Sequence, residues 1–203
     1  MGREIELKIP LQPLEYEELL CVIQGQKKLD GVSFGKVEHF LKSDTYFSRY
    51  ETEEERRLAV KQDKEPKVIR IRTEQSDGDK KSYFCLKFKT IQNGVEFNSE
   101  NETLIQDEQP LELFMKYADY KKYFEKNKDS YAVYCKSDVD SEVEFHLELV
   151  IVNGHKYVEI EVTQSQLESD RISRALEAFV VQLGFDPAKK DSRSWMEIIR
   201  DKD

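Results

Sequence analysis

Charged and aliphatic residues alternate in the stretch Glu4-Ile5-Glu6-Leu7-Lys8-Ile9. Successive side chains of a β-strand point to opposite faces, so the three aliphatic residues share one face and the three charged residues share the other. The stretch therefore predicts a strand with one face for a core and a second face that is charged rather than merely polar.

The same division between an aliphatic and a charged face recurs in segments far apart in the sequence. The charged members of these segments are Arg70 and Arg72, Lys87 and Lys89, Glu100 and Glu102, Glu144, His146 and Glu148, and Glu159 and Glu161. In one strand alone, this pattern is typical of the solvated face of a half-buried antiparallel sheet. In the whole set it indicates more, because like charges two residues apart on one face repel each other unless a counter-ion lies between them.

The residue types in these rows indicate which counter-ions would suit them. Paired carboxylates are ligands for hard divalent cations such as Mg²⁺, and rows of Arg and Lys bind phosphate oxygens. Eight strands are about the number that closes into a barrel with a small interior. The pattern therefore predicts a metal and phosphate site inside an antiparallel barrel.

The expected fold class is α+β, an eight-stranded antiparallel β-barrel with flanking α-helices, in a single domain over residues 1–203. The strands are expected at residues 3–9, 37–47, 68–74, 82–90, 95–104, 131–136, 143–152 and 155–163, with Asn93-Gly94 and Asn153-Gly154 as tight hairpin turns.

Helical periodicity appears between the strands. Three segments show it: one after Pro13, one after Pro110, and one from Ile172 to Leu183 that ends at Gly184. A short last helix is expected to start at Asp191 or Ser192 and to run through Trp195, Ile198 and Ile199. Residues 49–67 are expected to form a solvated loop or a short helix that connects two strands.

Composition limits the classes of function. The chain has 203 residues, of which 38% are hydrophobic and 36% charged, and its formal net charge of -9 argues against general binding of nucleic acid. No apolar run approaches the roughly 18 residues of a membrane helix. Cys21, Cys85 and Cys135 form no CxxC pair, so a disulfide framework or a cysteine-rich zinc site is not supported, and a reducing cytoplasm is the expected location.

Six motifs in sequence order resemble the CYTH superfamily, the triphosphate tunnel metalloenzymes. The first is Glu4-Ile5-Glu6-Leu7-Lys8, which looks like the E-x-E-x-K signature of that family. The others are Asp44-Thr45-Tyr46-Phe47, Ile69-Arg70-Ile71-Arg72, Leu86-Lys87-Phe88-Lys89, Tyr157-Val158-Glu159-Ile160-Glu161-Val162 and Ser194-Trp195-Met196-Glu197-Ile198-Ile199. The resemblance covers almost the whole chain and implies an eight-stranded tunnel that binds a triphosphate together with one or two Mg²⁺ or Mn²⁺ ions.

The resemblance also implies roles for individual residues. Direct metal ligands are expected at Glu4, Glu6 and Glu161, with Glu159, Glu148, Glu100 and Glu102 as further ligands or holders of water. The basic side chains expected to bind the substrate phosphates are Lys8, Arg70, Arg72, Lys87, Lys89 and Lys136. Catalysis is assigned to Glu4, Glu6, Lys8, Arg72 and Lys89.

Three further side chains are open to two interpretations. Tyr46 contacts substrate or only packs, and His146 contacts the ligand or metal or is a structural hydrogen-bond partner. Arg193, with Lys189 and Lys190, closes over one mouth of the tunnel or belongs to a solvated helix end.

The sequence departs from the family pattern at several positions. Asn98 stands where the family usually has an Arg, so a basic contact is missing or is replaced by Lys87. The strand at 131–136 offers only Lys136, and Glu148 stands where the family tends to have Asp. The expected set holds six cations and seven carboxylates, a sum of -1, which two divalent ions would raise to +3. We therefore expect a triphosphate to bind with its metal.

The favoured activity is metal-dependent hydrolysis of a triphosphate. Inorganic tripolyphosphate is the favoured substrate, and ATP or thiamine triphosphate are alternatives. A class IV adenylyl cyclase, which makes cyclic AMP and pyrophosphate from ATP, and a non-catalytic binder of polyphosphate or nucleotide remain open, as does the choice between a monomer and a homodimer.

Overall fold

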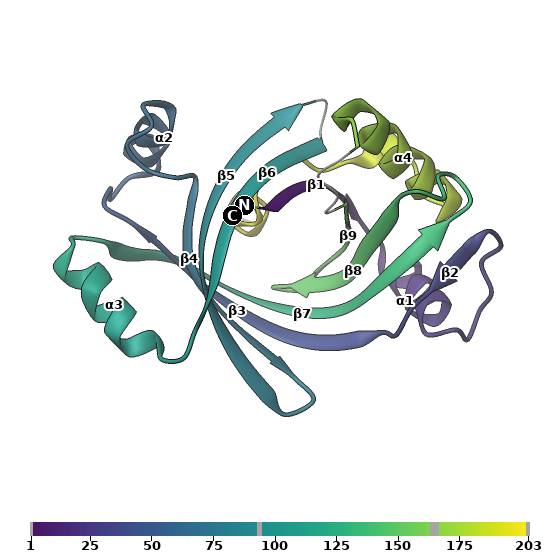
Figure 1. The fold of residues 1–203 in the computed structure, drawn as a ribbon, viewed down its shortest axis with the longest axis horizontal. Coiled ribbons are helices and arrows are strands. Elements are labelled where there is room, and N and C mark those ends of the chain that lie inside the picture. Colours follow the sequence, from purple (N-terminus) through teal and green to yellow (C-terminus); the bar gives the residue numbers. More distant parts are fainter. Residues whose placement is uncertain (1, 93–94, 163–166, 202–203) are drawn as a thin grey trace.

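Nine strands form one antiparallel sheet in the computed structural model, which describes residues 2–92, 95–162 and 167–201. The strands are β1 (Gly2–Pro10), β2 (Val32–Phe34), β3 (Glu38–Ser48), β4 (Val68–Ser76), β5 (Asp79–Gln92), β6 (Val95–Ile105), β7 (Lys121–Ser137), β8 (Glu144–Val152) and β9 (His155–Val162). Eight of them follow each other in the order β7-β3-β4-β5-β6-β1-β9-β8, and the pairing of β7 with β8 closes the ring. Figure 1 shows these strands curving around a central opening.

The eight strands expected from the sequence are confirmed, with two differences. The strand expected at 131–136 is much longer, because β7 starts at Lys121. A ninth strand, β2, was not predicted; it spans three residues and pairs with the end of β7 at Lys136 and its neighbours. The Asn153-Gly154 turn has positive φ at both residues, 50° and 80°, as a type I′ hairpin requires. Asn93-Gly94 and the last residue of the strand expected at 155–163 lie outside the described residues.

The described residues form five α-helices: α1 (Pro13–Ile23), α2 (Glu53–Lys61), α3 (Glu108–Tyr117), α4 (Ser169–Gln182) and α5 (Trp195–Arg200). Figure 1 shows α1, α2, α3 and α4 around the ring of strands, and side chains of α5 line its interior. A 3₁₀ turn covers Pro187–Lys189. The segment expected as a loop or short helix is α2, which Thr52 caps by accepting a bond from the Glu55 backbone. The last helix is capped by Ser194, not by Asp191 or Ser192. None of the described helices is long and apolar enough to cross a membrane.

The hydrophobic core lies outside the barrel wall, between the strands and the helices. The aliphatic face of β1, with Ile5 and Leu7, packs with the apolar faces of β8 and β9 and of helices α1 and α4. A smaller cluster joins Ile69 and Ile71 of β4 to Met115 of α3. Because the apolar faces point outward under helices, the charged faces of the same strands point into the barrel.

Candidate functional site

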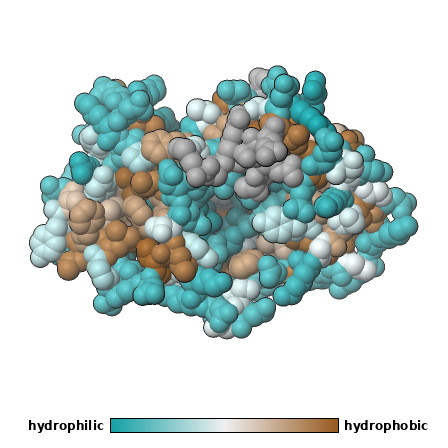
Figure 2. Space-filling model, in the orientation of Figure 1, coloured by the Kyte–Doolittle hydropathy of each residue, from teal (hydrophilic) through white to brown (hydrophobic). Residues whose placement is uncertain are grey.

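The inside of the barrel is a cavity of about 1280 Å³, lined by side chains from all eight barrel strands and from α2 and α5. Figure 2 shows a hollow near the centre of the molecule with hydrophilic atoms on its visible walls. The charged strand faces predicted from the sequence therefore meet around one enclosed space.

Almost all residues that the sequence analysis assigned to the site line this cavity. They are Glu4, Glu6, Lys8, Tyr46, Arg70, Arg72, Lys87, Lys89, Glu100, Glu102, His146, Glu148, Glu159, Glu161 and Arg193. Lys136 is the exception and corrects the prediction: it is exposed, pairs in register with Glu144 at the start of β8, and is not among the lining residues. It has the inward phase of β7 but lies beyond the enclosed part of the barrel.

Several lining residues were not predicted. Lys126 and Lys128 of β7 are buried inside the barrel, as are Lys42 of β3 and Glu96 of β6, and Glu74 of β4 lines the cavity beside them. Lys42 and Glu96 have the same phase as predicted neighbours on their strands, so alternation could have found them. Lys126 and Lys128 carried no such signal, because Glu125 and Asn127 on the outer face are also polar and are exposed.

Most of the charges inside the barrel are divided between two halves of the wall, with Lys8 of β1 and Glu74 of β4 as exceptions. The cationic wall, made by β7, β3, β4 and β5, carries seven basic residues: Lys42, Arg70, Arg72, Lys87, Lys89, Lys126 and Lys128. The acidic wall, made by β6, β1, β9 and β8, carries eight glutamates: Glu4, Glu6, Glu96, Glu100, Glu102, Glu148, Glu159 and Glu161. Such a division provides phosphate ligands on one side and metal ligands on the other.

Lysines connect the two walls. Lys87 Nζ lies 3.2 Å from carboxylate oxygens of Glu4 and of Glu100, and Lys128 Nζ lies 2.5 Å from oxygens of Glu148 and of Glu159. Burial alone would favour the protonated acid, but Lys128 outweighs it and holds the pKa of Glu159 at about 2. Glu159 also accepts a 2.7 Å hydrogen bond from Trp195 Nε1 of α5. Glu159 is therefore already well compensated by a cation.

Two glutamates of β1 are compensated much less. Burial raises the pKa of Glu4 to about 7, with Lys87 opposing the effect and Glu100 and Glu161 adding to it. Burial also raises the pKa of Glu6 to about 7, helped by Glu96 and Glu159. In the strand register Glu6 lies directly between Glu96 and Glu161, and carboxylates placed opposite one another repel.

Carboxylate oxygens whose negative charge is only partly compensated fit a divalent cation such as Mg²⁺ or Mn²⁺. Glu4, Glu6 and Glu161 are the residues that would hold it, because they share this region of the acidic wall and Glu6 and Glu161 are register partners. His146 donates a 3.1 Å hydrogen bond from Nδ1 to a carboxylate oxygen of Glu161, which fixes the carboxylate from the side of β8. This contact agrees with the structural interpretation of His146.

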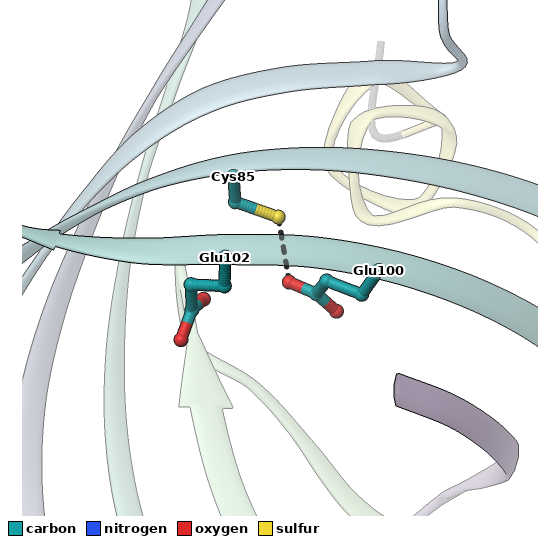
Figure 3. A group of neighbouring side chains, drawn as sticks. All are labelled: Cys85, Glu100 and Glu102. Carbon is teal, nitrogen blue, oxygen red and sulfur yellow. Dashed lines mark hydrogen bonds between the residues drawn. The ribbon is translucent and has the colours of Figure 1, made fainter. Parts of the chain in front are cut away.

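A second group of potential ligands lies on β5 and β6. Figure 3 shows Cys85 and Glu100 pointing toward each other, with Glu102 beside them; one ligand atom from each lies within 4.8 Å of the others. The thiol donates to Glu100, and burial raises the pKa of Cys85 to about 12, so the sulfur keeps its proton. Lys87 and Arg70 hold the pKa of Glu100 at about 2 against the effect of burial. Because Glu100 is already paired with two cations, this group suits an additional hard cation less well than Glu4 and Glu6 do.

Asn98, the departure noted in the sequence, is buried between its register partners Glu4 and Lys89. Neither its amide nitrogen nor its amide oxygen has a hydrogen-bond partner in the described part of the chain. Lys87 contacts Glu4, so a cation stands next to this position. The arrangement is consistent with the idea that Lys87 replaces the missing Arg.

No protein-family model matches the sequence, and no curated protein matches it. Solved structures match it over nearly the whole chain. The PH1819 protein from Pyrococcus horikoshii OT3 is 22% identical, with a TM-score of 0.70 over 98% of this chain and 99% of that chain. A candidate adenylate cyclase from Vibrio parahaemolyticus is 15% identical, with a TM-score of 0.63 over 97% of each chain. HpAC1 from Hippeastrum, a candidate adenylyl cyclase with a dominant triphosphatase activity, is 16% identical, with a TM-score of 0.63 over 99% of this chain and 96% of that chain.

These likenesses define a class of fold: an eight-stranded antiparallel barrel flanked by helices, with a charged interior. This is the fold of the CYTH proteins and triphosphate tunnel metalloenzymes, as the sequence resemblance implied. Identities of 15–22% establish the fold, and the activity has to be argued from the residues inside the barrel.

Proposed function

We propose that this chain is a Mg²⁺- or Mn²⁺-dependent triphosphatase that hydrolyses inorganic tripolyphosphate, and nucleoside or thiamine triphosphates less efficiently. The observation that supports this most directly is the division of charge into a cationic and an acidic wall around one cavity. A polyphosphate with a bound divalent cation has a matching division of charge. Its anionic oxygens match the cationic wall, and its cation matches the acidic wall.

The cationic wall would bind the phosphate chain. Arg72, Arg70 and Lys126 line one stretch of the cavity, and Lys87 and Lys89 follow on the neighbouring strand. These groups present many N–H donors in fixed positions, so they can neutralise the charge that develops on the transferred phosphoryl group without reorganising. Contacts of this kind recognise phosphates and make no use of an organic substituent.

The acidic wall would hold the metal at Glu4, Glu6 and Glu161. When bound, a divalent cation polarises phosphoryl oxygens and lowers the pKa of a coordinated water. Lys8 is a cation on the acidic wall, 3.3 Å from Glu96, so it can contact a phosphate that reaches this side. In the reaction, the oxygen of water bonds to the terminal phosphorus, the bond to the bridging oxygen breaks, and orthophosphate and pyrophosphate leave.

The decisive experiment compares kcat/KM for tripolyphosphate, ATP and thiamine triphosphate in the presence of Mg²⁺ or Mn²⁺, with product analysis. We expect tripolyphosphate to be turned over at least as efficiently as ATP, with release of orthophosphate from the chain end. Cyclic AMP and pyrophosphate from ATP, with tripolyphosphate acting only as an inhibitor, would establish the cyclase alternative instead. Tight binding without turnover of any substrate would establish a non-catalytic binder.

Cellular context follows from fewer observations. Cys21, Cys85 and Cys135 are all free thiols, which fits a reducing compartment such as the cytoplasm. The proposed partner is a small-molecule triphosphate, bound by a monomer or a homodimer, with no role for nucleic acid or a membrane.

A further inference from the structure

Asp44 of β3 is a carboxylate that sits behind the cationic wall. Its side chain is 0% exposed, and it is not among the residues that line the cavity. In the strand register, Asp44 lies directly between Arg72 of β4 and Lys126 of β7. The three residues form a row across three neighbouring strands, with the anion in the middle.

Every oxygen of Asp44 is occupied by a donor from the cationic wall. Arg72 binds it through one edge of its guanidinium with two hydrogen bonds, from Nε to Oδ1 at 2.7 Å and from Nη2 to Oδ2 at 3.0 Å. Lys126 Nζ lies 3.0 Å from Oδ2, and Arg70 Nη1 lies 3.7 Å from it. The Tyr46 hydroxyl donates to the same oxygen at 3.3 Å. Burial opposes ionisation, but these cations hold the pKa of Asp44 well below its usual range.

The cations have other carboxylates within reach. Arg72 Nη1 lies 3.8 Å from Glu74, and Arg70 Nη2 lies 3.1 Å from Glu100 and 3.9 Å from Glu102. Without Asp44, repulsion between Arg72 and Lys126 would favour rotation of the guanidinium toward such partners. Asp44 anchors Arg72 through one edge from behind, which leaves the remaining N–H groups of Arg72 and Lys126 directed to the cavity that both residues line.

We propose that Asp44 is a positioning residue: it fixes Arg72 and Lys126 of the cationic wall in the orientation that binds phosphate. This inference rests on the proposed triphosphatase function. Asp44 touches no substrate. Its contribution is geometric, and a misplacement of about 1 Å in a group that stabilises the transition state costs about 100-fold in rate. A carboxylate that merely competed with phosphate for Arg72 would have the opposite effect, since its removal would strengthen substrate binding.

The test uses Asp44→Asn, which keeps the size of the side chain but removes the charge and one acceptor. Its matched control is Asp140→Asn, because Asp140 accepts the same two-pronged contact from Arg171, at 2.9 and 2.8 Å, away from the cavity. Steady-state kinetics with tripolyphosphate and Mg²⁺ are measured on both variants, together with the Arg72 Nε–H signal in a ¹H–¹⁵N spectrum of the free protein.

For Asp44→Asn we expect kcat to fall about 10- to 100-fold and KM to change less than about threefold, because lost orientation and lost repulsion act on affinity in opposite directions. The hydrogen-bonded Arg72 Nε–H signal should disappear. Asp140→Asn should lower the thermal midpoint and leave kcat, KM and the Arg72 signal unchanged. If Asp44→Asn does not fold, Arg72→Lys, which keeps the charge but cannot make both contacts, should show the same loss of kcat.

Three results would overturn the proposal. The first is an unchanged kcat in Asp44→Asn or, where that variant does not fold, in Arg72→Lys. The second is a tenfold gain in affinity of Asp44→Asn for tripolyphosphate with undiminished kcat. The third is persistence of the hydrogen-bonded Arg72 Nε–H signal in Asp44→Asn. A wild-type protein that turns over no triphosphate would instead refute the proposed function. In that case the Arg72 Nε–H signal alone would test the positioning role, so the two failures are distinguishable.

Discussion

Replacing Glu6 by Gln should make the metal-free protein more stable while removing a metal ligand. Burial, with the neighbouring Glu96 and Glu159, raises the pKa of Glu6 from 4.5 to about 7. A carboxyl whose pKa is raised on folding favours the protonated form in the native state. Its ionised form therefore destabilises the fold, and this cost grows as the pH rises from 4.5 and becomes constant above about 7.

The size of the effect follows from the shift. One pKa unit corresponds to about 1.4 kcal/mol, and Glu6 is only partly buried, so we expect a gain of about 2 to 3 kcal/mol for Glu6→Gln at pH 8. In a chain of this length, that gain raises the thermal midpoint by about 4 to 12 °C. Most of the gain should vanish at pH 5, where the wild-type carboxyl is largely protonated in the folded protein.

The assay is thermal unfolding of wild type and Glu6→Gln in chelator at pH 5 and pH 8, repeated with Mg²⁺ or Mn²⁺. The divalent ion should stabilise the wild type at pH 8 and have little effect on the variant, because binding to the native state alone raises stability. Glu18→Gln, at an exposed position of α1, is the control and should change neither value. A Glu6→Gln protein that is less stable than wild type in chelator, by the same amount at pH 8 and pH 5, would refute the raised pKa of Glu6. Equal stabilisation of both proteins by the divalent ion at pH 8 would refute the metal-ligand assignment.

Three further predictions concern other parts of the barrel. Tripolyphosphate should bind tightly only with a divalent cation, so calorimetry that gives equal affinity with and without chelator would contradict a metal-bridged site. Lys128→Ala should cost about 3 to 5 kcal/mol in chemical denaturation, because it leaves Glu159 buried without its lysine and Glu148 with Lys42 alone, whereas Lys136→Ala at the exposed end of β7 should stay within about 0.5 kcal/mol. Ile5→Asn should destabilise the fold by at least about 3 kcal/mol, since Ile5 is 1% exposed under the helices; a stable Ile5→Asn protein would mean that the two faces of β1 are exchanged.

The fold could be predicted from the sequence because most strands have one aliphatic face. In β1, β4 and β9 the helices outside the barrel require residues such as Ile5, Ile71 and Ile160 at every second position, which produces a clear period of two. The charged residues between them then face the barrel interior by geometry alone. This is why the sequence placed the glutamates of β1 and β9 on the inner face of the barrel, where they line the cavity.

The first half of β7 lacks that signal, and the missed part of the site lies there. Its outer face carries exposed polar residues such as Glu125 and Asn127, while its inner face carries Lys126 and Lys128, which are buried. Polarity is the same on both faces although burial is opposite, so no alternation marks the strand. Tyr123 and Phe124 lie beyond the end of α3 at Tyr117; both aromatic residues belong to β7 and line the cavity.

Asp44 shows a second limit of sequence patterns. Its phase places it inside the barrel with Tyr46, but the strand period does not tell whether a residue reaches the cavity or stays behind it. That depends on its register partners, Arg72 and Lys126, which come from β4 and β7. Long-range pairing therefore decides which of the inward charges are ligands and which hold the ligands in place.

Under the proposed function, the division of charge between the two walls predicts that the metal and the triphosphate depend on each other for binding. Lys87 and Lys128 pair with glutamates of the acidic wall, so a phosphate must compete with carboxylates for them. A divalent cation at Glu4 and Glu6 would take over part of that negative charge and release lysine donors for phosphate. By linkage, phosphate on the cationic wall must strengthen metal binding by the same factor. Metal and triphosphate should therefore bind with positive coupling, because each one satisfies charges that otherwise only the other wall of the barrel can neutralise.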